Sequence, residues 1–214
     1  MGENRLTITA WNMRSLGCAE TYIHELMTFS DILVLSEHRL YENELHRLEM
    51  LSNKFEFQSK SSKDLEAAKQ TRQSGHCGIS ICWRAEINHK IKVIEIRSDR
   101  LCIIEIVKAI EQQSLFVIGV YLPQQGCKIT SFDHHLNILS ELIAACQEKG
   151  EVLIIGDTNC HFGKDIHSRF GGQSTQNAKK MMQSITSCNM QIIDGQRICS
   201  GPNYTFHVDG VGTS

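Results

Sequence analysis

The sequence lacks a strong charge of either sign, and this absence excludes one class of protein. Its 214 residues include 22 Lys and Arg against 24 Asp and Glu. A protein that only coats polyanions normally has a basic excess, so the balance argues against such a binder. It leaves room for a nucleic-acid enzyme in which clustered acidic residues hold a metal and basic loops hold phosphate.

The nine cysteines lack the spacing of a zinc site, because no two of them stand three positions apart. Their number is odd, and the polar start Met1–Arg5 shows no secretory leader. We therefore expect a reducing compartment, the nucleus or the cytoplasm. The longest apolar runs are far too short for a membrane span, so no membrane association is predicted.

Periodic apolar residues in the first quarter of the chain predict strand-helix-strand order. Strands are expected over Arg5–Trp11 and Asp31–Leu35, with a short one over Phe55–Phe57. Helical spacing predicts helices over Glu20–Phe29 and Tyr41–Leu51. The fully apolar run after Asp31 is typical of a buried strand.

Four β-like segments with short polar connections follow and predict an antiparallel meander. They are Gly78–Arg84, Lys90–Ile96, Leu101–Val107 and Leu115–Tyr121. The segment before them, Ser59–His76, has no periodicity and carries four basic residues. It predicts a surface loop, either a contact for a nucleic-acid backbone or a solvated connection.

The last third predicts a second strand-helix-strand order. A helix from Ser131 to about Gln147 is followed by a strand over Glu151–Ile155 and a helix over Gln176–Ser187. Short strands are expected near Met190–Ile193 and Tyr204–Phe206. Because no linker or short repeat interrupts the chain, we predict a single domain over 1–214, with two packed sheets and helices on their outer faces.

Polar residues directly follow four of the predicted apolar strands: Asn12, Glu37, Tyr121, and Asp157 with Asn159. Groups at strand ends are held rigidly and can converge on a crevice. Each has an ordinary interpretation when taken singly, as a turn residue, a solvated strand end or a core-edge aromatic. All of them in one chain and in this order indicate a functional site.

The series WNMRSLG, LSEHRL, GHCGISICWR, RLCIIEI, VYLPQ, IIGDTNCHFG and NYTF resembles the endonuclease/exonuclease/phosphatase superfamily. The segment RFGGQSTQNAKKMMQSITSCNMQIID, followed by GPNYTF, looks most like the endonuclease domain of LINE-type (non-LTR) retrotransposons. The resemblance implies a DNase-like α/β fold. This is a four-layer α/β/β/α sandwich of two packed mixed β-sheets flanked by helices.

The resemblance also implies a role for each residue of the site. Glu37 would hold one Mg²⁺ or Mn²⁺ ion, a hard cation that prefers oxygen ligands, with Asn12 beside it. Asp157 would orient and deprotonate the attacking water, and Asn159 would help to position that water. Tyr121 would hydrogen-bond a phosphate oxygen as negative charge builds on it.

Two further residues are candidates for substrate binding. Thr205 matches a threonine that lies near the scissile phosphate in the retrotransposon pattern. Arg100 matches a basic position, with an ordinary surface arginine as the competing interpretation. The implied substrate is double-stranded DNA, nicked to leave a 3′-hydroxyl primer for a reverse transcriptase encoded downstream in the same reading frame.

The sequence departs from the family pattern in two places. Gln124 stands where the family often has Asn, and this weakens the phosphate contact expected there. The pattern continues with a Ser-x-Ile-Asp-Tyr strand and a Ser-Asp-His motif, whereas this sequence reaches Ser214 where the first should begin. We therefore expect a domain that is incomplete at its C-terminus, misses its last strands and is inactive as a fragment.

Two other functions stay open at this point. One keeps the fold and changes the substrate, giving a phosphatase or a lipid phosphodiesterase. The other is a catalytically dead remnant that acts as a binding module.

Overall fold

The computed structural model describes residues 5–61, 77–108, 113–126, 129–163, 174–193, 206–208 and 211–213. The chain divides into two compact units. The first comprises Met1–Leu122 with Glu141–Thr158, and the second comprises Pro123–Ser140 with Asn159–Ser214. The single domain expected over 1–214 stays a prediction.

Sheet A lies in the first unit and has the strand order β1-β2-β4-β3. Strand β1 (Ile8–Asn12) is parallel to β2 (Ile32–Ser36), because α1 (Leu16–Phe29) returns the chain to the same end of the sheet. The other neighbours, β4 (Ile79–Arg84) and β3 (Phe55–Lys60), pair antiparallel. The predicted order of strand, helix and strand is confirmed, with α1 beginning four residues earlier than the expected start at Glu20.

Sheet B belongs to the same unit and has the order β5-β6-β7-β8. Strands β5 (Ile91–Ile94), β6 (Leu101–Ile106) and β7 (Ser114–Tyr121) form an antiparallel meander. Helix α4 (Ile129–Gln147) then leads to β8 (Gly150–Asp157), which pairs parallel with β7. Each sheet therefore carries one parallel pair made by a helical crossover.

The predicted four-stranded meander is wrong in its first member. The segment expected over Gly78–Arg84 is β4 of sheet A, between β2 and β3. The 3₁₀ turns of η2 (Ala85–Lys90) follow it, and the next strand, β5, begins sheet B. Alternation marks a strand but does not reveal its partner, and this is why the sequence could not separate the two sheets.

Three other predicted elements differ from the structure. The helix expected over Tyr41–Leu51 is a short 3₁₀ helix η1 (Glu42–Glu44) followed by one α-turn, α2 (His46–Glu49). Helix α4 begins at Ile129, two residues before the expected start. No strand forms over Met190–Ile193, where the described chain is irregular.

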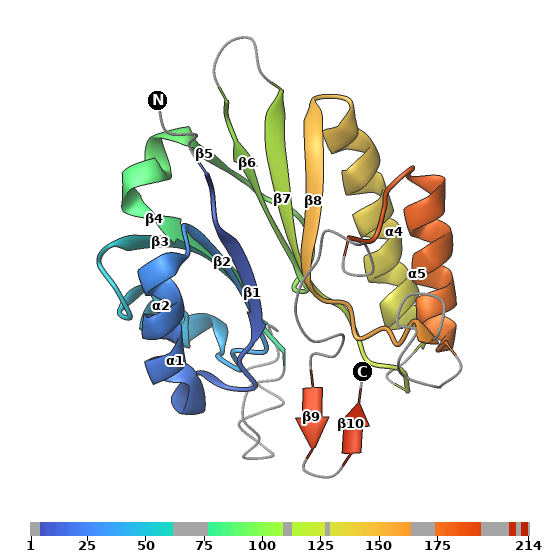
Figure 1. Cartoon of the computed structure of the whole chain (residues 1–214), viewed down its shortest axis with the longest axis horizontal. Helices are drawn as coiled ribbons and strands as arrows, with labels where there is room; N and C mark the ends of the chain where they lie inside the picture. The colour runs from blue at the N-terminus through green and yellow to red at the C-terminus, as the bar shows by residue number, and fades with distance from the viewer. Residues whose placement is uncertain are drawn as a thin grey trace. The chain divides into compact units, whose positions relative to one another are not determined.

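The core of the first unit lies on both faces of β2, whose five residues are all buried. Alternate residues of the strand point to opposite faces and so enter different clusters. Leu33 and Leu35 join a cluster with Ile23 of α1, and Ile32 and Val34 join a second cluster shared with sheet B. Burying each such side chain stabilises the fold by roughly 1.5–3 kcal/mol. Figure 1 shows α1 on the outer side of sheet A. Two mixed four-stranded sheets flanked by helices thus form the expected α/β sandwich.

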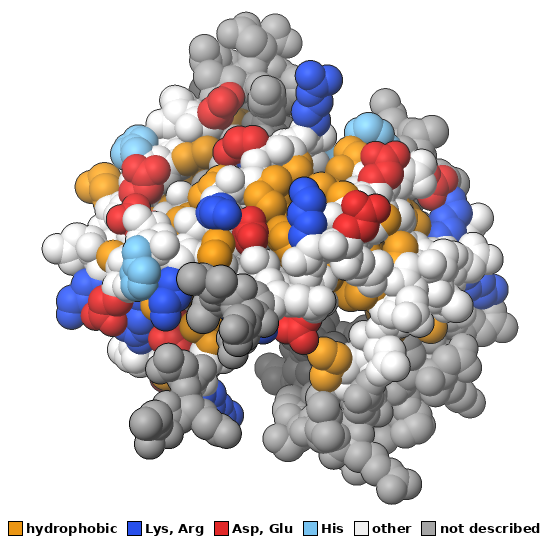
Figure 2. All heavy atoms as spheres, turned by 90° about the horizontal axis from the view of Figure 1, so that it is seen from above, with side chains coloured by type: hydrophobic (Ala, Val, Ile, Leu, Met, Phe, Trp, Pro, Cys, Tyr) orange, Lys and Arg blue, Asp and Glu red, His pale blue; other side chains and the backbone are white. Residues whose placement is uncertain are grey.

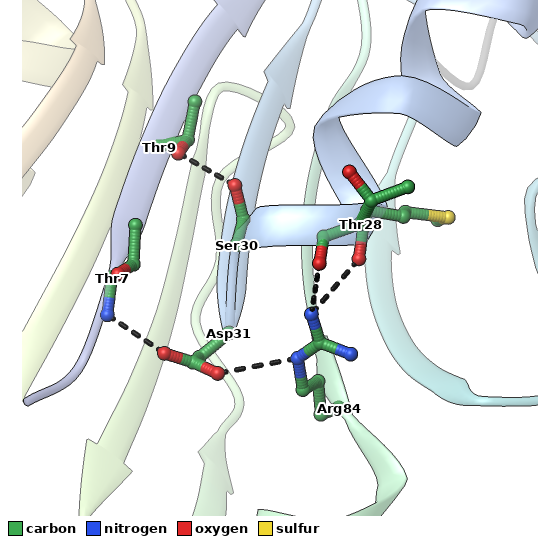
Figure 3. Close-up of polar contacts among 7 residues, drawn as sticks. Thr7, Thr9, Thr28, Ser30, Asp31 and Arg84 are labelled. Atoms are coloured by element: carbon green, nitrogen blue, oxygen red, sulfur yellow. Dashed lines mark hydrogen bonds and ion pairs between the residues drawn. The ribbon is translucent and has the colours of Figure 1, made fainter. Parts of the chain in front are cut away.

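An ion pair ties α1, β1 and β4 together at one end of sheet A (Figure 3). Arg84 donates from Nε to Asp31 Oδ1 at 3.2 Å and from Nη2 to the carbonyls of Met27 and Thr28, each at 3.0 Å. Asp31 Oδ2 accepts from the backbone N–H of Thr7 at 2.8 Å. The guanidinium thereby satisfies carbonyls at the end of α1 that have no partner within the helix.

In the second unit, α5 (Gln176–Ser187) has the predicted bounds. It begins at the N-cap Thr175, whose hydroxyl accepts from the Ala178 N–H at 3.2 Å. Lys180 binds both carboxylate oxygens of Asp133 on α4, at 2.6 and 2.7 Å. Strands β9 (Phe206–Val208) and β10 (Val211–Thr213) form an antiparallel pair; Tyr204 and Thr205, expected at the start of this strand, lie outside the described residues.

The surface reflects the balanced composition. Figure 2 shows one face on which acidic and basic side chains of the described residues are interspersed and do not gather into a field of one sign. Among the helices of the described part of the chain, none is long and apolar enough to cross a membrane.

Candidate active site

The last residues of β1 and β8 meet through their side chains. Asn12 donates from Nδ2 to Oδ2 of Asp157 at 2.7 Å. The amide oxygen of Asn12 accepts from the backbone N–H of Arg14 at 3.0 Å. Because both ends of the amide are used, its orientation is fixed, and one oxygen of the Asp157 carboxylate is held with it.

Asp157 is placed by pairing with the neighbouring strand. It lies opposite Tyr121 in the parallel register of β7 and β8, and its carbonyl accepts from the Leu122 N–H at 2.9 Å. Gly156 just before it has φ 135°, and a Cβ there would lie 2.2 Å from the Val120 carbonyl oxygen. The glycine of the Gly-Asp-Thr-Asn run is therefore required by close backbone approach.

Glu37 follows β2 in a left-handed conformation, with φ 61°. Its N–H donates to the carbonyl of Gly78 at 2.7 Å, so the residue just before β4 fixes its backbone. Its carboxylate is 14% exposed and pairs with the guanidinium of Arg39, whose Nε donates to Oε1 at 3.1 Å. A non-glycine residue in this region costs about 1–2 kcal/mol.

Tyr121, the register partner of Asp157, is in contact with an arginine. The guanidinium of Arg100 stands 5.3 Å from the centre of its ring, and Nη1 lies 3.5 Å from its carbonyl oxygen. Burial raises the pKa of the Tyr121 hydroxyl, and the charges of Glu37 and Asp157 raise it further. The phenol therefore stays protonated and can donate a hydrogen bond. In the strand register, Tyr121 lies opposite Asp157, and Glu37 follows Ser36, which is the register partner of Asn12.

Neither a family model nor a curated protein matches this sequence, but solved structures match its architecture. The AP endonuclease of Leishmania major has a TM-score of 0.62 at 13% identity, and the 3′ phosphatase NExo from Neisseria, bound to a product DNA hairpin, has 0.59 at 16%. The endonuclease domain of TRAS1, a telomere-specific non-LTR retrotransposon, has 0.56 at 12%. The matches cover 84%, 86% and 86% of this chain. This is the endonuclease/exonuclease/phosphatase fold.

The chain spans about two thirds of the length of these structures, 66%, 71% and 71% respectively. At such low identity the likeness establishes the endonuclease/exonuclease/phosphatase fold and not the reaction. The activity therefore has to be inferred from the side chains of this chain itself.

Within this fold, a side-chain hydrogen bond joins Asn12 to Asp157, Tyr121 is paired with Asp157 in the strand register, and Glu37 follows Ser36, the register partner of Asn12. The fifth residue of the set, Asn159, has a left-handed backbone with φ 50° and belongs to the second unit.

Of the two candidate substrate-binding residues, Arg100 packs on Tyr121 and so belongs to the same group. Thr205 lies outside the described residues, and its role stays a prediction.

Two residues of this region are missed by sequence reasoning. Arg39 pairs with Glu37, and His38, in the loop that follows β2, is fully buried. A histidine and an arginine after a strand have no distinctive spacing. Their roles arise from contacts with residues far away in the chain, which the local sequence does not reveal.

A divalent cation of the kind implied by the endonuclease/exonuclease/phosphatase fold suits these side chains. Glu37 offers a carboxylate that already binds a cationic group, the guanidinium of Arg39. No three His, Cys, Asp or Glu side chains of the described residues converge as a metal cage. Mg²⁺ is commonly bound by one or two carboxylates with water as its other ligands, whereas zinc sites need three or four protein ligands.

Proposed function

We propose that this chain forms the catalytic core of a divalent-metal-dependent phosphodiesterase that nicks double-stranded DNA. The observation that carries the proposal is the hydrogen bond from Asn12 to Asp157. Tyr121 lies opposite Asp157 in the strand register, and Glu37 follows Ser36, the register partner of Asn12. This arrangement combines an oriented base, a hydrogen-bond donor and a cation ligand at the ends of β1, β2, β7 and β8.

Each residue has a defined task in the hydrolysis of a phosphodiester. Asp157, with Oδ2 held by Asn12, orients a water and accepts its proton as the water attacks phosphorus. Asn159 helps to position that water. Tyr121 donates its hydroxyl hydrogen to a phosphate oxygen, where negative charge increases in the transition state.

Glu37, with Asn12 beside it, would hold one Mg²⁺ or Mn²⁺ ion. When bound, the ion neutralises charge on the phosphate oxygens and on the leaving group. Arg100 and Thr205 are proposed to contact the substrate, with Arg100 supplying positive charge beside Tyr121.

DNA as the substrate is supported by the solved structures with this fold, which include AP endonucleases and a retrotransposon endonuclease. We propose target-site nicking for a non-LTR retrotransposon, with a reverse-transcriptase region downstream and with the nucleus or cytoplasm as the compartment. We also propose that these 214 residues alone are inactive, because the sequence contains no Ser-Asp-His motif.

Cation binding by the chain itself is the first test. Mn²⁺ titration, followed by the loss of the free-ion electron paramagnetic resonance signal, should show one site that Glu37→Gln weakens by about tenfold or more. The matched control Glu56→Gln removes an exposed carboxylate at the far end of β3 and should leave the affinity unchanged. Equal affinity in all three proteins contradicts the proposed ion site.

Catalysis is tested in the reading frame extended beyond Ser214, with supercoiled plasmid and Mg²⁺. Nicked circles with 3′-hydroxyl ends are expected, and Asp157→Asn should slow their formation by about 10²- to 10⁴-fold. Equal nicking by both proteins would remove the role of Asp157. Cation binding without any hydrolysis would favour the catalytically dead remnant.

A phosphatase is the second candidate, because NExo, a solved structure with this fold, is a 3′ phosphatase seen with a DNA hairpin. A duplex carrying a 3′-phosphate distinguishes the two activities. Release of inorganic phosphate without nicks in the plasmid would replace the endonuclease with this alternative.

A further inference from the structure

The loop that carries Glu37 has an unusual backbone on both sides of His38. Glu37 and Arg39 are both left-handed, with φ 61° and 57°. Their N–H groups donate to the carbonyls of Gly78 and Cys77 at 2.7 and 2.9 Å. Such a conformation persists only where surrounding contacts enforce it, since each residue costs about 1–2 kcal/mol.

The side chain of His38 supplies such contacts from inside the protein. It is fully buried, and the N–H of Leu40 donates to its Nδ1 at 3.1 Å. Nδ1 is therefore unprotonated, and the ring hydrogen is on Nε2. From there it donates to the carbonyl of Lys60, the last residue of β3, at 3.1 Å. The imidazole thus bridges the Glu37 loop and β3 in one defined tautomer.

Gly78 leaves the space that the ring occupies. A Cβ at this position would lie 2.3–2.5 Å from three atoms of the His38 imidazole, and the backbone there has φ 100°. The same glycine accepts the hydrogen bond from Glu37. The His38 ring therefore packs on Gly78, and Gly78 in turn holds the backbone of Glu37. The side chains of Glu37 and Arg39 pair with each other at the surface.

We propose that His38 is a positioning residue that fixes the direction of the Glu37 carboxylate by bridging the Leu40 N–H and the Lys60 carbonyl. This inference rests on the proposed function, in which Glu37 is the cation ligand. It adds the reason why the Glu37 carboxylate points in one fixed direction. His38 itself contacts neither cation nor substrate. Its replacement should disorder the carboxylate while the sheets remain folded.

The first test does not depend on any metal. The Nε–H of Arg39 is bonded to Glu37 Oε1 at 3.1 Å, so it should give a distinct, slowly exchanging ¹⁵N–¹H signal, assigned by its loss in Arg39→Lys. In His38→Ala this signal should move to the position of a solvated arginine. Asn can accept from the Leu40 N–H as Nδ1 does, so His38→Asn should restore much of the shift. An unchanged signal in His38→Ala overturns the proposal.

The second test uses the cation. His38→Ala should weaken Mn²⁺ binding by about tenfold, and His38→Asn should recover part of the loss. His135→Asn, a buried histidine on α4, is the matched control and should bind as the unmodified chain does. If the unmodified chain and Glu37→Gln bind Mn²⁺ equally, the proposed function fails. The Arg39 Nε–H signal of the first test still decides the role of His38 in that case. If only Glu37→Gln weakens binding, the role of His38 is wrong and the ion site stands.

A third variant covers the case in which His38→Ala does not fold. Gly78→Ala keeps the imidazole and displaces it, so it should lose the arginine signal and the cation affinity as His38→Ala would. The double variant His38→Asn, Gly78→Ala relieves part of the clash and should be less impaired than Gly78→Ala alone. Full retention of the signal in Gly78→Ala contradicts the packing on which the proposal depends.

Discussion

Asn12 and Asp157 are 145 positions apart and lie in different sheets, yet their side chains share a hydrogen bond of 2.7 Å. Each is the final residue of an edge strand, β1 in sheet A and β8 in sheet B. The bond therefore reports how the two sheets are packed as well as how the proposed base is held. A change in sheet packing would act directly on the orientation of Asp157.

Replacing Asn12 by Asp keeps the shape of the side chain and substitutes a carboxylate for the donor. At pH 7 we expect Asn12→Asp to lower the free energy of unfolding by about 2 kcal/mol, more than Asn12→Ser, since two like charges would share a site. The repulsion raises the pKa of the pair in the folded state, so the lost stability should return as the pH falls and one carboxyl is protonated. Chemical denaturation at pH 7 and pH 5 measures both effects; equal losses for Asp and Ser would contradict the contact.

At the proposed ion site, Arg39 and the divalent cation would compete for the Glu37 carboxylate. We expect Arg39→Ala to bind Mn²⁺ about three- to tenfold more tightly, because Oε1 of Glu37 is freed and one positive charge is removed. Arg47→Ala is the control, since this exposed arginine pairs with Glu44 at 3.5 Å away from the site. Weaker binding by Arg39→Ala would show that the guanidinium supports the ion site and does not oppose it.

The Arg84 contacts of Figure 3 should matter for stability and not for chemistry. Arg84→Ala removes the charged partner of Asp31 and the donor to two carbonyls at the end of α1, so we expect the free energy of unfolding to fall by about 2 kcal/mol. The surface pair of Arg47 and Glu44 provides the comparison, and Arg47→Ala should change the free energy of unfolding by less than about 0.5 kcal/mol. Denaturant titrations of both variants check the difference.

His38 should make stability depend on pH in the acidic range. Burial lowers its pKa from 6.5 to about 4, although hydrogen bonds to the backbone of Lys60 and Ile79 oppose the shift. Between these values the unfolded chain binds a proton that the folded chain does not bind. The contribution of His38 is therefore complete above pH 6.5 and is lost as the pH falls toward 4, by about 3 kcal/mol.

The free energy of unfolding measured from pH 7 to pH 4 tests this dependence. His38→Gln has no titrating group and should give a flatter profile over the same range. An identical slope in both proteins would assign the acid sensitivity to other groups.

Much of the fold could be predicted from the sequence, because local patterns report local structure. The apolar run of β2 and the amphipathic α5 were located within a residue or two. Sheet membership could not be predicted, as β4 shows. Its alternation is compatible with a partner in either sheet, and only its pairing with β2 and β3 in the folded chain places it in sheet A. Tyr41–Leu51 likewise has helical spacing but breaks after one α-turn.

The sequence by itself determined the chemical types at the site: an amide, two carboxylates and a phenol, each at the end of an apolar strand. Only the tertiary structure decided how they are used. It joined Asn12 to Asp157, Arg39 to Glu37 and the ring of His38 to Gly78. The physical reason is that a hydrogen bond or a close contact depends on distance and direction in space, and strand register and sheet packing set both over separations that no local pattern encodes.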